Sequence, residues 1–169
     1  MIRPLTNAED GVALKIINEA ARAYQGIIPA NFWREPYMSE AELRAEIAAG
    51  VEFWTCQAGG GLLGVMGRQP LPEVTLIRHA YVRPSAQSQG IGARLLSHLL
   101  KGVSAPVLVG TWAAAWWAIR FYEKYGFRQV APEEKERLLR RYWTISDRQA
   151  EASVVLADGK WFASQSAPA

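Results

Sequence analysis

A turn with two glycines, set between an apolar strand and an apolar helix, most constrains how this chain can fold. Residues 74–82, VTLIRHAYV, have the composition of a strand, and residues 93–100, ARLLSHLL, carry their leucines on one helical face. The connecting PSAQSQGIGA, residues 84–93, contains Gly90 and Gly92 and no acidic residue. The first N–H groups of a helix lack partners and carry partial positive charge, and glycine lets an anion approach them. We therefore expect the turn to hold a pyrophosphate, with a tight turn that binds nothing as the alternative.

Length, charge and cysteine content exclude several classes of protein. A chain of 169 residues, half of them hydrophobic, is long enough for one domain with a buried core. Cys56 is its only cysteine, which excludes an internal disulfide and a cysteine-rich zinc site. The net charge is +3, but the basic residues are scattered, so no nucleic acid partner is expected. The longest apolar run, residues 112–119, is far shorter than the roughly 18 residues of a membrane span, and we expect a cytoplasmic protein without a membrane partner.

Strand and helix patterns alternate along the chain and indicate one α/β domain. Further strands are expected at residues 1–5, 51–58, 62–69, 106–112, 126–130 and 151–157. Further helices are expected at residues 8–24, 40–49, 116–125 and 131–143. Ser39 and Glu42 form a capping box, and Pro132 suits the first turn of its helix. Residues 1–157 are expected to form the domain and residues 158–169 a C-terminal tail.

Two blocks of the sequence resemble one family. After a strand that ends in YVRP, the stretch QSQGIG at residues 87–92 resembles the acetyl-CoA signature of the GNAT N-acetyltransferase superfamily. AIRFYEKYGF, residues 118–127, resembles the helix-to-strand block of the same superfamily and lies at the expected distance downstream. A P-loop would instead need Lys and then Ser or Thr where Ala93 and Arg94 stand, and a dinucleotide fingerprint would need a third glycine at Leu95. The resemblance covers about residues 1–157.

The resemblance implies a fold and an activity. The fold is the α/β GNAT acyl-CoA N-acyltransferase fold, with a mixed central sheet of about six to seven strands flanked by helices. The implied reaction moves the acetyl group of acetyl-CoA to a primary amine of an unidentified small-molecule or peptide acceptor, by direct attack in a ternary complex. No metal is expected, because neither His79 nor His98 has carboxylate or thiol neighbours at ligand spacing. A non-catalytic module that binds or senses acyl-CoA is the alternative, and the apolar C-terminal strand and Trp-rich segments fit a homodimer.

The same resemblance assigns the cofactor-binding residues. The backbone amides that would hold the pyrophosphate of CoA belong to Gln87, Ser88, Gln89, Gly90, Ile91, Gly92 and Ala93. The exposed strand edge at Ala80, Tyr81 and Val82 would pair with the pantetheine arm, and the Val82 N–H would stabilise an oxyanion. In the family this strand separates from the next one, here residues 107–112, and the gap admits the cofactor.

Tyr122 and His79 are the catalytic candidates. Tyr122 matches the tyrosine that commonly sits near the CoA sulfur as a general acid, and a phenol holds its proton at neutral pH. The strand lacks the glutamate that often serves as the base, which leaves His79, a water chain from Glu73, or no dedicated base. The alternatives are a core aromatic for Tyr122 and a residue that fills one face of the sheet for His79. Ala115 stands where many members carry an Asn that touches the cofactor.

Aromatic and apolar residues in two segments are the candidates for binding the acceptor. In the family the acceptor site is shaped by the segment between the first two helices and by residues near the last strands. The candidates here are Tyr24, Ile27, Ile28, Phe32, Trp33 and Tyr37, with Trp112, Trp116 and Trp117 as a second cluster. They indicate a partly apolar or planar acceptor, with lid packing or a dimer surface as the alternative.

Overall fold

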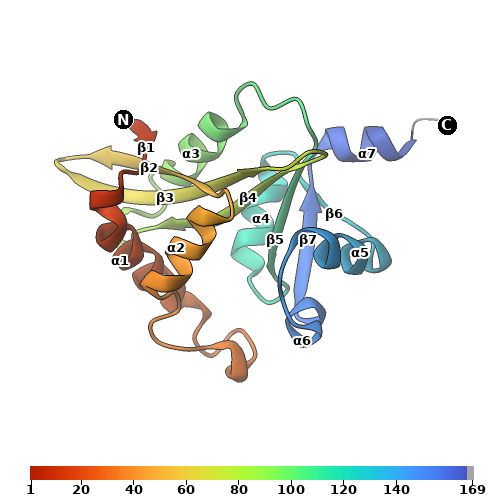
Figure 1. The fold of residues 1–169 in the computed structure, drawn as a ribbon, viewed down its shortest axis with the longest axis horizontal. Coiled ribbons are helices and arrows are strands. Elements are labelled where there is room, and N and C mark those ends of the chain that lie inside the picture. The colour runs from red at the N-terminus through yellow and green to blue at the C-terminus, as the bar shows by residue number, and fades with distance from the viewer. Residues whose placement is uncertain (167–169) are drawn as a thin grey trace.

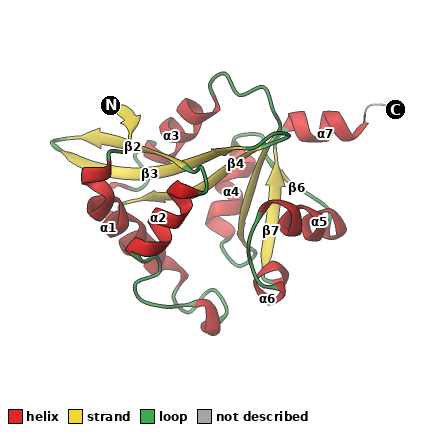
Figure 2. Ribbon diagram, viewed as in Figure 1, coloured by secondary structure: helices red, strands yellow, loops and turns green. Residues whose placement is uncertain are grey.

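The computed structural model describes residues 1–166, which form one mixed sheet flanked by helices (Figures 1 and 2). The strands are β1 (Ile2–Pro4), β2 (Glu52–Ala58), β3 (Gly61–Pro70), β4 (Thr75–Val82), β5 (Val107–Trp112), β6 (Arg128–Gln129) and β7 (Ser153–Ala157). They lie in the order β1-β2-β3-β4-β5-β7-β6, and every neighbouring pair is antiparallel except β4 and β5, which run parallel. This confirms the expected mixed sheet of six to seven strands.

Helices cover both faces of this sheet. They are α1 (Asp10–Ala21), α2 (Glu40–Ala48), α3 (Ile91–Leu100), α4 (Trp116–Lys124), α5 (Pro132–Tyr142), α6 (Asp147–Glu151) and α7 (Gly159–Ser166). Helices α1 and α2 lie on one face and α3 and α4 on the other, while α5, α6 and α7 pack against β7 (Figure 1). In the part of the chain that the structure describes, no helix is long and apolar enough to cross a membrane.

Apolar clusters on the two faces hold the β2–β4 half of the sheet between its helices. Ile16 of α1 packs with Val65 of β3 on one face, and Leu95 of α3 packs with Met66 of β3 on the other. Val65 and Met66 thus point to opposite faces, as successive strand residues do. Full burial of each such side chain contributes about 1.5–3 kcal/mol relative to leaving it exposed.

Two helices near the C-terminus were not predicted from the sequence. Helix α6 begins after Ser146, whose hydroxyl caps its first turn, and it takes up the start of the last predicted strand, so that β7 begins two residues later than expected. Helix α7 occupies residues 159–166 of the expected tail and buries Trp161. Both helices are short, and so their sequences show little of the 3.6-residue apolar period. Residues 167–169 of that tail lie outside the described residues.

A β-bulge interrupts β4 where it pairs with β3. The pairing changes register between Val65 and Gly67, and His79 on β4 has a positive φ of 52°. The extra residue places Arg78 and His79 consecutively on the face covered by α2, where both contact Glu46. In a regular strand these two neighbours would point to opposite faces of the sheet.

Beyond the bulge, β4 and β5 part. Their parallel pairing covers three residue pairs and ends at Ile77 and Val109, which confirms the expected separation of these strands. Val82 lies opposite Gly64 in a non-hydrogen-bonded position, because the residue after Val82 donates its N–H to the Leu63 carbonyl (2.9 Å). The N–H and C=O of Val82 therefore face the gap that β5 leaves.

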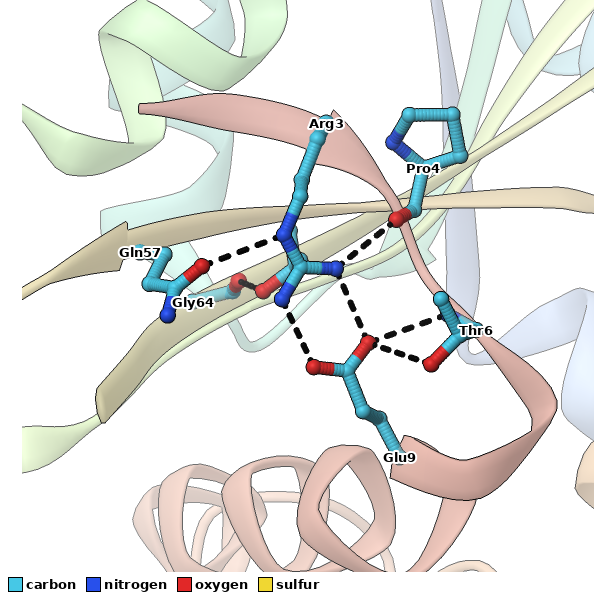
Figure 3. Close-up of polar contacts among 7 residues, drawn as sticks. Arg3, Pro4, Thr6, Glu9, Gln57 and Gly64 are labelled. Carbon is cyan, nitrogen blue, oxygen red and sulfur yellow. Dashed lines mark hydrogen bonds and ion pairs between the residues drawn. The ribbon is translucent and has the colours of Figure 1, made fainter. Parts of the chain in front are cut away.

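A polar network ties the edge strand β1 to the start of the first helix (Figure 3). The Arg3 guanidinium donates to both carboxylate oxygens of Glu9 (2.7 and 2.9 Å) and, through Nε, to Oε1 of Gln57 on β2 (3.1 Å). Glu9 also accepts from the N–H and the hydroxyl of Thr6. The hydrogen bond from Arg3, together with those from Thr6, lowers the pKa of Glu9 to about 2. The short strand is thus anchored both to β2 and to the helix that follows it.

We predict that Gly67→Ala lowers the free energy of unfolding by about 1–3 kcal/mol, a usual cost of overpacking. A Cβ at this position would lie 2.7 Å from Cγ1 of Val51 and 3.0 Å from the carbonyl oxygen of Arg78 in the bulge. Gly61→Ala on the same strand is the control, since a Cβ there would meet nothing within 4 Å. Chemical denaturation followed by tryptophan fluorescence measures both variants, and equal stabilities would contradict this role of Gly67.

Candidate active site

A cavity of about 590 Å³ lies at the gap between β4 and β5. Its walls come from residues of the segment 24–46, from the ends of β4 and β5, and from residues between α5 and the start of β7. Tyr122 lines it from α4, which packs on the opposite face of the sheet. The cavity therefore reaches through the gap, so that groups from both faces can act on one ligand.

Tyr122 belongs both to the core and to the cavity wall. The residue is 5% exposed, and its ring meets those of Phe121 and Phe127 edge to face, with centroids 5.1 and 5.7 Å away. Burial raises the pKa of the Tyr122 phenol, and the nearby Tyr24 raises it further. The phenol therefore keeps its proton through the neutral range and is available as a donor. Packing in the core and a place in the site are compatible for this residue.

His79 forms a charged cluster with Arg78 and Glu46 on the α2 side of the cavity. Its Nε2 lies 2.9 Å from Oε2 of Glu46, and the Arg78 guanidinium lies 3.0 Å from the same oxygen. The imidazole also stacks on the Phe53 ring, with centroids 5.7 Å apart. An ionised carboxylate only accepts hydrogen bonds, so Nε2 carries the hydrogen and the lone pair of a neutral ring resides on Nδ1.

Glu46 was not predicted from the sequence as a site residue, because only the bulge brings β4 side chains to it. Burial raises the pKa of Glu46, but the hydrogen bond with His79 and the positive charges of His79 and Arg78 outweigh burial and bring it below its ordinary value of 4.5. Glu73, the carboxylate considered as an alternative, instead accepts from the Tyr142 hydroxyl on α5 (2.8 Å). It lies outside the cavity wall formed by the described residues.

The glycine turn presents backbone N–H groups at the start of α3. Within residues 1–166, no protein acceptor pairs with the N–H groups of residues 88–93. Gly90 is the N-cap residue, with a φ of 73°, and Ser88 also has a positive φ, of 63°. Consecutive N–H groups in such a turn form an anion-binding hollow, and α3 adds the partial positive charge of its N-terminus. These residues fit a phosphate or pyrophosphate group.

The two glycines of the turn differ in what they do. Gly90 adopts the left-handed conformation, whereas Gly92 faces α4, where a Cβ would meet the Phe121 ring at an ordinary contact distance of 3.4 Å. The Gln87 side chain donates through Nε2 to the Val82 carbonyl (3.2 Å), which directs that side chain back to the gap. Of the remaining predicted cofactor-binding residues, Ala80 and Tyr81 line the cavity and Ile91 is buried in the core.

The predicted acceptor-binding residues divide between the cavity and its surroundings. Tyr24, Phe32 and Trp112 line the cavity, and the rings of Phe32 and Trp112 lie 5.3 Å apart. Ile28 is buried in the cluster that holds Trp112. Trp33 instead lines a second, smaller cavity of about 410 Å³. The first three residues are thus placed to meet an acceptor, and Ile28 supports them.

Of the second predicted aromatic cluster, Trp112 and Trp117 belong to one apolar cluster, and the rings of Trp116 and Trp117 meet edge to face with centroids 5.8 Å apart. Tyr37 lines the main cavity and accepts a hydrogen bond from Nε1 of Trp112 (2.8 Å). Trp117 stacks on the ring of Tyr24 with centroids 5.9 Å apart. Trp116 is 59% exposed and Trp117 is half-buried, because successive residues of a helix lie about 100° apart around its axis.

Trp143 and Gly110 form a part of the wall that the sequence did not predict. Trp143 follows α5, and its indole lies against the bare backbone of Gly110 on β5, where a Cβ would be 3.1 Å from Cε2 and Cζ2 of the ring. Gly110 comes directly after the last pair between β4 and β5. A glycine inside an apolar strand was the one sequence signal for such a close approach.

The α/β fold in which two parallel strands part beside a glycine turn is shared by solved structures of acetyltransferases. A GNAT-family acetyltransferase from Staphylococcus aureus Mu50 has a TM-score of 0.71 at 14% identity, over 95% of this chain and 98% of that one. The PaiA N-acetyltransferase from Thermoplasma acidophilum, solved in complex with coenzyme A, has a TM-score of 0.70 at 18% identity, over 94% and 97%. The ribosomal-protein-S18-alanine N-acetyltransferase from Escherichia coli has a TM-score of 0.67 at 19% identity, over 94% and 92%. At these identities the likeness establishes the fold.

The family follows from the sequence match. The model of the acetyltransferase (GNAT) domain matches residues 16–141, well over half of the chain. Among curated proteins, no match is found. The chain belongs to the GNAT acetyltransferase family and is an acyltransferase, as the blocks at residues 87–92 and 118–127 predicted.

We predict that Glu46→Gln lowers the free energy of unfolding by about 1.5–3 kcal/mol near pH 6, the usual contribution of a charged hydrogen bond, and that this difference shrinks as the pH falls below about 4.5. A carboxyl whose folded pKa is lowered stabilises the fold above its unfolded pKa, and that contribution is lost as the pH falls through the folded value. The charged groups that face Glu46 are Arg78 and His79 from β4 and Glu42 from its own helix. Denaturation from pH 3.5 to 7 measures the effect.

The control for this prediction is Glu40→Gln on the same helix, where the carboxylate pairs with Arg44 in an exposed position. Its stability should follow the wild-type pH profile. A pH-independent difference between wild type and Glu46→Gln would mean that the Glu46 charge contributes nothing to the fold.

Proposed function

We propose that this enzyme transfers the acetyl group of acetyl-CoA to a primary amine bound in the cavity. The observation that supports this most is the gap between β4 and β5, which opens beside the partnerless N–H groups of residues 88–93 and is lined by Tyr122. Acetyl-CoA would supply an activated acyl group and a thiolate leaving group. The Thermoplasma relative with the same fold was solved with coenzyme A, which agrees with the proposal.

The proposed CoA-binding residues are those of the glycine turn and the end of β4. The N–H groups of residues 88–93 would hold the pyrophosphate, with the Gln87 side chain beside them. The free edge of β4 at residues 80–82 would pair with the pantetheine arm, since the N–H and C=O of Val82 are not engaged by β3. Asp and Glu are absent from residues 84–93, so no carboxylate there repels the phosphates.

Two groups of the chain would act on the reacting atoms. The Val82 N–H faces the gap and would donate to the oxygen that becomes negative during attack. Tyr122 would give its proton to the departing sulfur, because burial keeps that phenol protonated. These donors come from opposite sides of the gap, β4 and α4, which the cavity joins.

We assign the proton-accepting role to His79, with Glu46 as the residue that positions it. The hydrogen bond from Nε2 to Glu46 leaves Nδ1 as the basic atom, and the stacking on Phe53 holds the ring plane. Arg78 shares the Glu46 carboxylate, so the oxygen that accepts the hydrogen bond of His79 also takes part in an ion pair. Loss of the amine proton to bulk water, without a dedicated base, is the competing route.

The second candidate function is a module that binds or senses acyl-CoA without turnover. It would use the same turn and gap and would leave Tyr122 as a core residue only, for which the ring contacts with Phe121 and Phe127 are sufficient. Release of CoA with any amine would support the acetyltransferase, and no release with a broad panel of amines would support the binding module. The cytoplasmic location and the homodimer stay predictions.

The first prediction concerns the anion site. Gly90→Asp should weaken acetyl-CoA binding at least roughly tenfold more than Gly90→Asn, because the two side chains are nearly isosteric and differ in charge beside the expected phosphates. Both residue types tolerate the left-handed backbone that Gly90 adopts, with a φ of 73°. Titration calorimetry measures the two affinities, and equal values would remove the pyrophosphate from this turn.

The second prediction concerns the acid. Tyr122→Phe should lower kcat about ten- to a thousandfold and leave the acetyl-CoA affinity unchanged, as expected for a lost proton donor. Because the pKa of Tyr122 is raised, no descending limb from this phenol should enter the profile of kcat between pH 6 and 9. Tyr125→Phe, at an exposed tyrosine of the same region, is the control. A full kcat in Tyr122→Phe would assign the ring to the core alone.

The third prediction concerns the base. With His79 as proton acceptor, the ascending limb of kcat/KM should keep its midpoint when the acceptor is exchanged for one of different basicity, and His79→Gln should abolish it. Glu46→Gln should move that midpoint without abolishing the limb, because it changes the hydrogen-bond partner of the imidazole and leaves the imidazole itself in place. A limb that follows the pKa of each acceptor, and that survives His79→Gln, would show that the amine deprotonates in water.

A further inference from the structure

Charge is distributed unevenly around the main cavity. All its charged residues lie on the wall formed by the segment before α2, by α2 itself and by β4. They are Arg34, Glu42, Glu46, Arg78 and His79. The opposite wall is formed by the end of β5, the chain after α5 and the start of β7. Among the residues that the structure describes, this wall contains uncharged side chains only. An acceptor in the cavity therefore meets two chemically different surfaces.

The charges on the first wall already pair with one another. The Arg34 guanidinium forms an ion pair with Glu42, and the Arg78 guanidinium forms one with Glu46 (3.0 Å). His79 shares the same Glu46 oxygen at 2.9 Å. The wall thus holds two carboxylates, of which Glu42 pairs with Arg34 and Glu46 is shared by Arg78 and His79. Beside the Arg78–Glu46 pair, whose side chains are 18% and 23% exposed, a carboxylate or a second ammonium on the acceptor would have to break the pair or stay unpaired, and either is costly away from water.

The second wall is built around an aromatic plane. The Trp143 indole lies against the backbone of Gly110, at the point where β5 leaves β4. Ile145 and Leu139 line the cavity next to it, and Phe32 and Trp112 continue the aromatic surface toward the first wall. A planar, apolar group against these rings would be removed from water and would gain from ring stacking.

We infer that the acceptor is a small monoamine whose carbon body is apolar and planar, as in an arylalkylamine. The inference rests on the proposed acetyl transfer and specifies its substrate class. The amine would lie near His79 at the gap, and the aromatic body would lie against Trp143. Such a molecule carries one charge, and that charge is neutralised when the amine loses its proton to react.

The test compares matched acceptors by CoA thiol release. Phenethylamine, phenylalanine, which adds a carboxylate, and 1,5-diaminopentane, which replaces the ring by a second ammonium, are assayed with the full chain. Phenethylamine should have a kcat/KM at least roughly tenfold above each of the other two, since each of them brings an unpaired charge into the cavity. A higher kcat/KM for phenylalanine or for the diamine would overturn the inference while leaving acetyl transfer in place.

Two variants locate the aromatic body. Trp143→Ala should lower kcat/KM for phenethylamine roughly tenfold without changing the affinity for acetyl-CoA, and Gly110→Ala should act in the same direction because its Cβ would displace the ring. Phe162→Ala, which removes an aromatic ring of α7 outside the cavity wall, is the control. Unchanged kcat/KM in the folded Trp143→Ala variant would contradict the proposed contact.

Binding separates this inference from the proposed reaction. Phenethylamine is titrated by calorimetry into the protein saturated with CoA, for wild type and for Trp143→Ala. If no amine releases CoA but phenethylamine binds in a Trp143-dependent way, the site recognises the proposed class and the proposed activity is wrong. If phenethylamine neither binds nor reacts while another amine is acetylated, the activity stands and the substrate class is wrong.

Discussion

The bulge at His79 is the constraint on which the rest of the site depends. One extra residue in β4 changes which side chains face α2, and it occurs just where the pairing of β4 with β5 ends. Before it, β4 is held on both sides by neighbouring strands, and after it only by β3. The bulge thus brings Arg78 and His79 to Glu46. It also comes directly before the end of β4, whose edge is left open to a ligand because β5 no longer pairs with it. Gly67 on the neighbouring strand makes room for the bulge, because any larger residue would crowd the Arg78 carbonyl.

Several residues around the gap between β4 and β5 are held by packing or ion pairs and still line the cavity. Tyr122 is packed among aromatic rings and still lines the cavity, so the core that surrounds it also fixes where its hydroxyl points. Glu46 is held by its ion pair with Arg78 and by its hydrogen bond with His79, and its charge in turn orients the His79 ring. Groups held in this way need little reorganisation when a ligand arrives, which is the condition under which fixed dipoles and charges act most strongly. The ordering of these side chains occurs during folding and not during binding.

The sequence predicts those parts of the molecule whose signals are local. The capping box of Ser39 and Glu42 forms as expected, with both hydrogen bonds present, and the glycine turn lies between a strand and a helix as its pattern requires. The contact of Glu46 with His79 joins residues 33 positions apart, and that of Trp143 with Gly110 likewise depends on how distant segments pack. No periodicity or motif encodes such pairs, because they arise only when the register of β4 and the path of the chain after α5 are set.

The two walls of the cavity come from segments that contribute little to the proposed coenzyme side. The charged wall belongs largely to the chain around α2, and the aromatic wall to the chain after α5, whereas the turn and the gap are built by β4, α3 and β5. Substitutions in the first two segments can therefore alter which molecule is accepted without disturbing the parts proposed to hold the acyl donor. Evolution can vary such loops freely on a constant sheet, and the same separation offers a route to redesign: exchanging residues 143–149 alone would present a different surface to the incoming amine.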